Sequence, residues 1–97
     1  CYSDAELKVL AEVLNVERTV VLSDEIYADM SFDPEDRKST LTKYIKDKTV
    51  VTSAISKCHG AGGWRLGYAI IPDELDEFQK AILKVASETY SCVTSPI

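Results

Sequence analysis

The sequence has few basic residues, few cysteines and no long hydrophobic run, and each shortage argues against a class of protein. No apolar stretch approaches the roughly 20 residues that a transmembrane helix needs. Lys and Arg number 11 against 16 Asp and Glu, for a net charge of −5, and no basic cluster is present that would bind nucleic acid. Cys1, Cys58 and Cys92 form no CxxC pair. We therefore expect reduced thiols in a cytoplasmic protein, without a disulfide framework or a metal site.

What remains is the composition of a small globular domain. The 97 residues allow one domain at most, and a hydrophobic content of 45% argues against disorder. The chain starts with Cys1 rather than Met and stops at Ile97 after a short polar stretch. Neither end reads as a finished terminus, so we expect a piece of a longer protein.

Hydrophobic periodicity predicts alternating helices and strands, and so an α/β fold. The expected helices are 3–17, opened by a capping box of Ser3 and Glu6 and with Asn15 as a candidate end, one or two turns near 41–45, and 73–89 with an apolar face. The expected strands are 19–22, 49–55 and 64–71, the first two of them buried. A crossover joins the first two strands, which should therefore be parallel. Only a glycine-rich loop joins the last two, which should be antiparallel.

Polar side chains with chemical potential follow the first two strands. Ligands of α/β sheets bind at the carboxyl ends of strands, and Asp24 and Tyr27 come directly after the first. Their spacing would aim both side chains the same way on a helical turn. Lys57 has the same place after the second strand. Partial burial there would favour the neutral amine, which forms Schiff bases with carbonyl groups. Arg65, beside several glycines, suits a phosphate.

Each of these residues also has an ordinary structural interpretation. Lys57 alone could be a solvated surface lysine, and Asp24 could be a helix N-cap. Tyr27 could simply pack, and Arg65 could form a surface ion pair. We expect Glu25 to form a structural ion pair. Residue types and spacing by themselves therefore predict an α/β domain with a candidate anion site.

Residues 20–30 contain a D-E-I-Y segment, and residues 56–68 read S-K-x(5)-G-W-R-x-G-Y. These stretches resemble the corresponding segment and the lysine signature of the class I/II aminotransferase family, pyridoxal phosphate enzymes of the aspartate aminotransferase fold (fold type I). The tail, 86–97, is similar to the segment that leads out of the family's large domain. The resemblance covers nearly the whole chain. It implies a part of a three-layer αβα domain with a mainly parallel sheet.

The resemblance also implies a role for individual residues. Lys57 would hold pyridoxal 5′-phosphate in a Schiff base and, once released, move a proton to and from the substrate. Asp24 would pair with the ring nitrogen, so that the ring acts as an electron sink. Tyr27 would hydrogen-bond the phenolic oxygen. Arg65 would hold the phosphate, with a hydroxyl from Ser56.

At the level of the whole protein, the resemblance implies a homodimeric aminotransferase (EC 2.6.1.-) that acts on an amino acid and a 2-oxo acid. Residues 1–97 would be the C-terminal part of the large, cofactor-binding domain, without its N-terminal part and without the small domain, and inactive alone. One departure from the family is Ala54, where many members have Ser or Gly.

Three alternatives remain open at this point. The protein could be a lyase or synthase of the same fold, because these relatives use the same lysine and acid. It could be the cofactor-binding domain of a transcription regulator. It could also be an α/β binding module whose match is accidental, in which case replacing Lys57 would leave cofactor binding unchanged.

Overall fold

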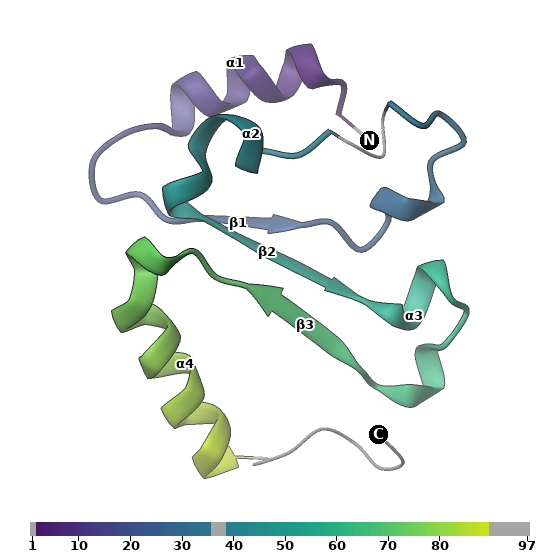
Figure 1. Ribbon diagram of the computed structural model, residues 1–97, viewed down its shortest axis with the longest axis vertical. Coiled ribbons are helices and arrows are strands. Elements are labelled where there is room, and N and C mark those ends of the chain that lie inside the picture. The colour runs from purple at the N-terminus through teal and green to yellow at the C-terminus, as the bar shows by residue number, and fades with distance from the viewer. Residues whose placement is uncertain (1, 36–38, 90–97) are drawn as a thin grey trace.

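The computed structural model describes residues 2–35 and 39–89, which form a three-stranded sheet with helices around it (Figure 1). The strands are β1 (Val21–Asp24), β2 (Thr49–Ala54) and β3 (Gly67–Ile70). The α-helices are α1 (Asp4–Leu14), α2 (Thr42–Ile45), α3 (Ile55–Cys58) and α4 (Asp76–Thr89). Short 3-10 turns are η1 (Ala28–Met30), η3 (Lys46–Lys48), η4 (Gly62–Trp64) and η5 (Asp73–Leu75).

The sheet has the order β1-β2-β3 and contains both strand directions that the sequence predicts. β1 and β2 are parallel, with Asp24 opposite Thr52. β2 and β3 are antiparallel, with Ala54 opposite Gly67. The carboxyl ends of β1 and β2 therefore lie at the same edge of the sheet, where α3 follows β2 (Figure 1). The α/β fold class is confirmed.

The hydrophobic core lies on one side of β1, under α1 and α2. Its buried members are Leu7, Ala11, Val21, Leu41 and Ile45. Side chains alternate between the two faces of a strand, so Val21 points into this core while its neighbour Leu22 is 68% exposed. The prediction that the first strand is buried on both faces is therefore wrong for the described residues, because the helices that pack on β1 cover one face.

The predicted capping box is present at the start of α1. The amide of Ser3 donates to Glu6 Oε2 at 2.8 Å, and the amide of Glu6 donates to Ser3 Oγ at 3.4 Å. These bonds satisfy backbone donors that a helix start otherwise leaves open. They also fix the end of α1 that lies beside α2, where Lys43 Nζ donates to Asp4 Oδ1 at 2.6 Å.

Several predicted boundaries differ from the observed ones. The first helix stops at Leu14, not at residue 17, and the candidate end Asn15 is its C-cap. Arg18 then has a φ of 63°. The first strand is Val21–Asp24, two residues later than the predicted 19–22. The third strand starts at Gly67, not at residue 64, because the chain first forms η4 and then takes a left-handed φ of 51° at Arg65. Local turns that the apolar pattern does not encode cause these shifts.

The apolar face predicted for the last helix is present in sequence but not covered. A 3-10 turn, η5, occupies the first part of the predicted 73–89, and α4 follows. Phe78 and Ile82 are each 41% exposed, and α4 has no buried residue. No helix within residues 2–35 and 39–89 has the length and hydrophobicity to cross a membrane.

Candidate functional site

Backbone pairing brings together the segments that follow β1 and β2. The two strands are parallel and end at the same edge of the sheet. Past the end of β1, the amide of Glu25 donates to the carbonyl of Thr52 at 2.9 Å, so the pairing extends by one residue. The turn after β1 and the helical turn α3 after β2 therefore start as neighbours, as is usual for ligand sites in α/β sheets.

Tyr27 and Lys57, which the sequence places after different strands, meet at this edge. η1 packs against α3, and Lys57 Nζ lies 5.9 Å from the centroid of the Tyr27 ring. This distance is within the range in which an ammonium is attracted to an aromatic face. The structure thus joins one member of the D-E-I-Y segment to the lysine of the second stretch, 30 residues along the chain.

Asp24 and Tyr27 do not share a helical turn, and that prediction is wrong. Asp24 is the last residue of β1, and Tyr27 precedes η1 in a turn. The amide of Glu25 is held by β2, which keeps the backbone extended past Asp24. The turn closes one step later, where the amide of Ala28 donates to the carbonyl of Glu25 at 3.0 Å. Asp24 Oδ1 accepts from the amide of Ile26 at 3.4 Å within the same turn.

The Lys57 side chain is exposed among the described residues, whereas the sequence predicts partial burial. α3 is a single helical turn at the end of β2, and a turn this short leaves the side chain of Lys57 in contact with solvent. Asp24 and Tyr27 are exposed as well. Each of the three side chains is therefore accessible to solvent.

The two predicted phosphate ligands lie in the segment that joins β2 to β3. Ser56 is half-buried on α3, next to Lys57. Arg65 follows η4, and its Nη1 donates to the carbonyl of Gly62 at 3.0 Å. Arg65 has a left-handed φ of 51°. This conformation is uncommon for a residue other than glycine, and such backbone strain clusters at functional sites. The role of Arg65 and Ser56 toward a phosphate stays a prediction.

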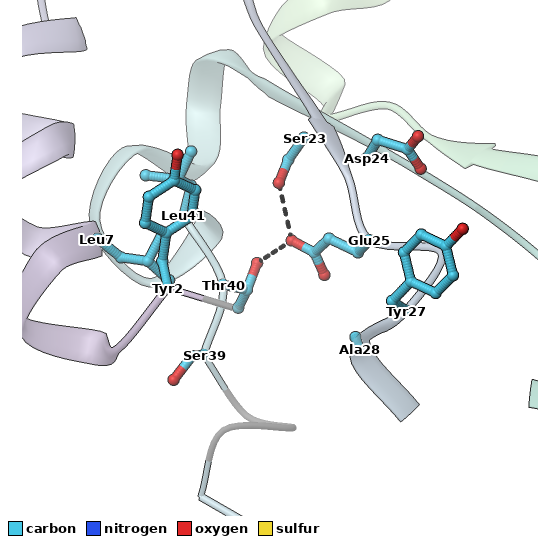
Figure 2. Close-up of a pocket in the computed structure, with 10 residues that line it drawn as sticks. All are labelled: Tyr2, Leu7, Ser23, Asp24, Glu25, Tyr27, Ala28, Ser39, Thr40 and Leu41. Carbon is cyan, nitrogen blue, oxygen red and sulfur yellow. Dashed lines mark hydrogen bonds between the residues drawn. The ribbon is translucent and has the colours of Figure 1, made fainter. Parts of the chain in front are cut away.

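Glu25 belongs to a hydrogen-bond network that the sequence analysis did not predict, since it expected Glu25 to form an ion pair. Glu25 Oε1 accepts from Thr40 Oγ1 at 2.6 Å and from Ser23 Oγ at 3.1 Å, so its partners are hydroxyl groups (Figure 2). A cavity of about 440 Å³ lies here, lined by Asp24, Tyr27 and these polar side chains. Strand alternation could have placed Ser23 and Glu25 on one face, but nothing local points to Thr40.

The remaining polar pair of the α3 loop is Cys58 and His59. Cys58 is a free cysteine whose Sγ lies 2.8 Å from His59 Nδ1. Among residues 2–35 and 39–89 there is no group of three or more His, Cys, Asp and Glu that could hold a metal. Cys1, Cys92 and most of the tail 86–97, to which predictions were also attached, lie outside the described residues.

Comparison with known proteins relates the whole chain to one family. The family model described as "Aminotransferase class I and II" matches residues 1–97. A "probable N-acetyl-LL-diaminopimelate aminotransferase" of Bacillus subtilis is 37% identical over 96% of the chain and 22% of its own length. An aspartate aminotransferase of Geobacillus stearothermophilus is 35% identical over 97% of the chain and 24% of its own length.

A solved structure shares the fold. The crystal structure of an aspartate aminotransferase from Thermotoga maritima matches with a TM-score of 0.79 and 27% identity, over 97% of the chain and 24% of the solved chain. The chain thus spans about a quarter of the length of these relatives.

Proposed function

The chain belongs to the class I and II aminotransferase family, and from this we propose that its protein transfers an amino group between an amino acid and a 2-oxo acid. Pyridoxal 5′-phosphate is the proposed cofactor, and Lys57 is the residue that would bind it covalently. The single observation that carries this proposal is the approach of Lys57 Nζ to the Tyr27 ring at 5.9 Å, at the edge where Asp24 ends β1.

The chemistry of the side chains fits this cofactor. It has an aldehyde, a ring nitrogen, a phenolic oxygen and a phosphate. The described residues offer an amine on Lys57, a carboxylate on Asp24, a phenol on Tyr27 and a guanidinium on Arg65, on segments that follow two neighbouring strands. Each group of the cofactor thus has a partner of matching charge or hydrogen-bonding type.

When bound, pyridoxal phosphate supplies an electron sink for the bonds around the substrate's α-carbon. The chain's residues do the rest. Asp24 would pair with the ring nitrogen and favour its protonated form, and Tyr27 would donate its hydroxyl proton toward the phenolic oxygen. Arg65 and Ser56 would bind the phosphate. Lys57 Nζ, when free, would be the base that takes the proton from the substrate's α-carbon.

We propose that residues 1–97 are the C-terminal part of the large domain of a longer, homodimeric enzyme. Two observations support the part of this proposal that makes the chain a piece of a larger folded unit. The chain spans about a quarter of the length of its relatives, and the outward faces of β1 and α4 carry exposed apolar side chains such as Leu22 and Phe78. On this proposal the chain alone contains the cofactor lysine but lacks a complete substrate site.

The test uses the full-length protein. It is incubated with pyridoxal phosphate, reduced with borohydride and digested, and the adduct is located by mass spectrometry. We expect the phosphopyridoxyl group on Lys57. The Lys57→Ala variant should lose this label, whereas Lys84→Ala, an exposed lysine on α4, should keep it. Labelling spread over other lysines, or unchanged in Lys57→Ala, would overturn the assignment.

Turnover assays separate the reaction from its relatives. The full-length protein should convert an amino acid and a 2-oxo acid into the exchanged pair. A bound cofactor on Lys57 with elimination or condensation products instead would favour a lyase or synthase. Transfer by residues 1–97 alone at enzyme-like rates would contradict the placement of this chain as a part of a larger domain.

A further inference from the structure

Four polar side chains beside Asp24 and Tyr27 form one connected group, which we call the Glu25 clamp: Ser23, Glu25, Thr40 and Thr42. Ser23 and Glu25 belong to β1 and the turn after it, Thr42 begins α2, and Thr40 lies two residues before that helix. Glu25 and Thr40 are 15 positions apart and bonded at 2.6 Å. The clamp therefore ties the turn after β1 to a separate element.

The number of protons fixes the direction of each bond. A threonine hydroxyl has one proton to donate, and Thr40 Oγ1 donates it to Glu25 Oε1 at 2.6 Å. The 3.0 Å contact between Thr40 Oγ1 and Thr42 Oγ1 then has Thr42 as donor, and the amide of Thr42 also donates to Thr40 Oγ1 at 3.3 Å. The whole chain of donors thus ends on one carboxylate oxygen, which Ser23 Oγ also reaches at 3.1 Å.

Glu25 is held on three sides. Its side chain is fixed by the clamp, its amide donates to Thr52 of β2, and its carbonyl accepts from Ala28. Figure 2 shows Asp24 on the other side of the strand from Ser23 and Glu25, and Tyr27 at the turn that follows. The two proposed cofactor ligands thus flank a residue that is bound to both neighbouring elements.

We propose that Glu25 is a positioning residue, whose hydrogen bonds to Thr40 and Ser23 hold the turn so that Asp24 and Tyr27 face the cofactor together. The inference rests on the proposed function, since it concerns the same site. On this proposal, Glu25 acts through Asp24 and Tyr27 rather than by contact with the cofactor. A carboxylate suits this work because hydrogen bonds to a charged acceptor are stronger than neutral ones, and because Glu25 and Thr40 are both half-buried, which lessens competition from water.

The main variants are Glu25→Gln, which keeps the shape without the charge, and Thr40→Val, which removes the hydroxyl at nearly constant volume. Thr40→Ser restores the hydroxyl. Thr49→Val is the matched control, because Thr49 Oγ1 also makes a short bond, at 2.7 Å to Ile45, but at the opposite end of the parallel strands from Asp24.

In the full-length holoenzyme, we expect Thr40→Val and Glu25→Gln to change the visible circular dichroism of the bound cofactor. They should also lower kcat/KM by about tenfold to a hundredfold, the effect expected for groups misplaced by about 1 Å. Thr40→Ser should restore both properties, and Thr49→Val should alter neither. Without cofactor, Thr40→Val should speed hydrogen exchange at the amides of Ile26 and Ala28, which bond within the turn.

The outcomes separate the two proposals. If the wild type carries its label on Lys57, and Tyr27→Phe changes the dichroism while Thr40→Val and Glu25→Gln do not, the positioning role is wrong and the proposed function stands. If Thr49→Val changed the cofactor dichroism as much as Thr40→Val does, the positioning role would also be wrong, because a general loss of stability would then explain both changes. If the wild type is not labelled on Lys57, the proposed function fails first, and unchanged amide exchange in Thr40→Val would independently refute the clamp.

Discussion

Replacing Thr49 by valine should destabilise the fold through one buried hydrogen bond. Thr49 begins β2 and is 2% exposed. Its Oγ1 donates to the carbonyl of Ile45, the last residue of α2, at 2.7 Å. Carbonyl groups at the end of a helix lack partners within the helix, so this side chain supplies one. Valine keeps the shape of threonine but removes the donor.

The size of the effect follows from two opposing terms. A buried acceptor left without its partner costs about 1–3 kcal/mol. The methyl group that replaces the hydroxyl returns about 0.8 kcal/mol through burial. The net loss in the free energy of unfolding is then about 0.2–2 kcal/mol. For a domain of 60–100 residues, this corresponds to a melting temperature lower by about 1–16 °C.

Thermal unfolding followed by circular dichroism measures this loss, with Thr49→Ser as the companion variant. Serine keeps the donor and loses the methyl group, so comparing the two variants separates the hydrogen bond from the packing. A melting temperature of Thr49→Val equal to or above that of the wild type would refute the reasoning, because the Ile45 carbonyl would then have found another partner at no cost.

Three further predictions concern the site and the pH response. Asp24→Asn should keep the label on Lys57 but lower kcat by about 100-fold or more, because a neutral amide does not stabilise a protonated ring nitrogen. Borohydride mapping tests the label, and a turnover assay tests kcat. Arg65→Lys should weaken pyridoxal phosphate binding about tenfold, because lysine lacks the planar fork of arginine, as a fluorescence titration would measure. The pKa of Asp4 is lowered by hydrogen bonds from Lys43 and then Tyr44. A carboxyl whose pKa is depressed by folding stabilises the fold above its unfolded pKa, so this contribution should fade as the pH falls below about 4, and Asp4→Asn should flatten acid unfolding curves in that range.

Patterns of residues close together in the chain were enough to predict the start of the first helix, the strand directions and the family. The capping box of Ser3 and Glu6 is a local pattern, and it is observed as predicted. The directions of the three strands followed from the lengths of their connections, because a crossover permits parallel pairing and a short loop does not. The family also followed from residues 20–30 and 56–68, whose residue types and spacing are read without coordinates.

Packing decided what depends on contacts between distant parts of the chain. The exposure of Leu22 and of α4 reflects which elements cover a face, and periodicity reports only that a face is apolar. The geometry of Asp24 and Tyr27 depended on pairing of the Glu25 amide with β2 rather than on local helical preference. The bond from Thr40 to Glu25 and the approach of Lys57 to Tyr27 join residues 15 and 30 positions apart. Sequence spacing carries no information on such distances, because only the folded backbone brings these side chains within reach.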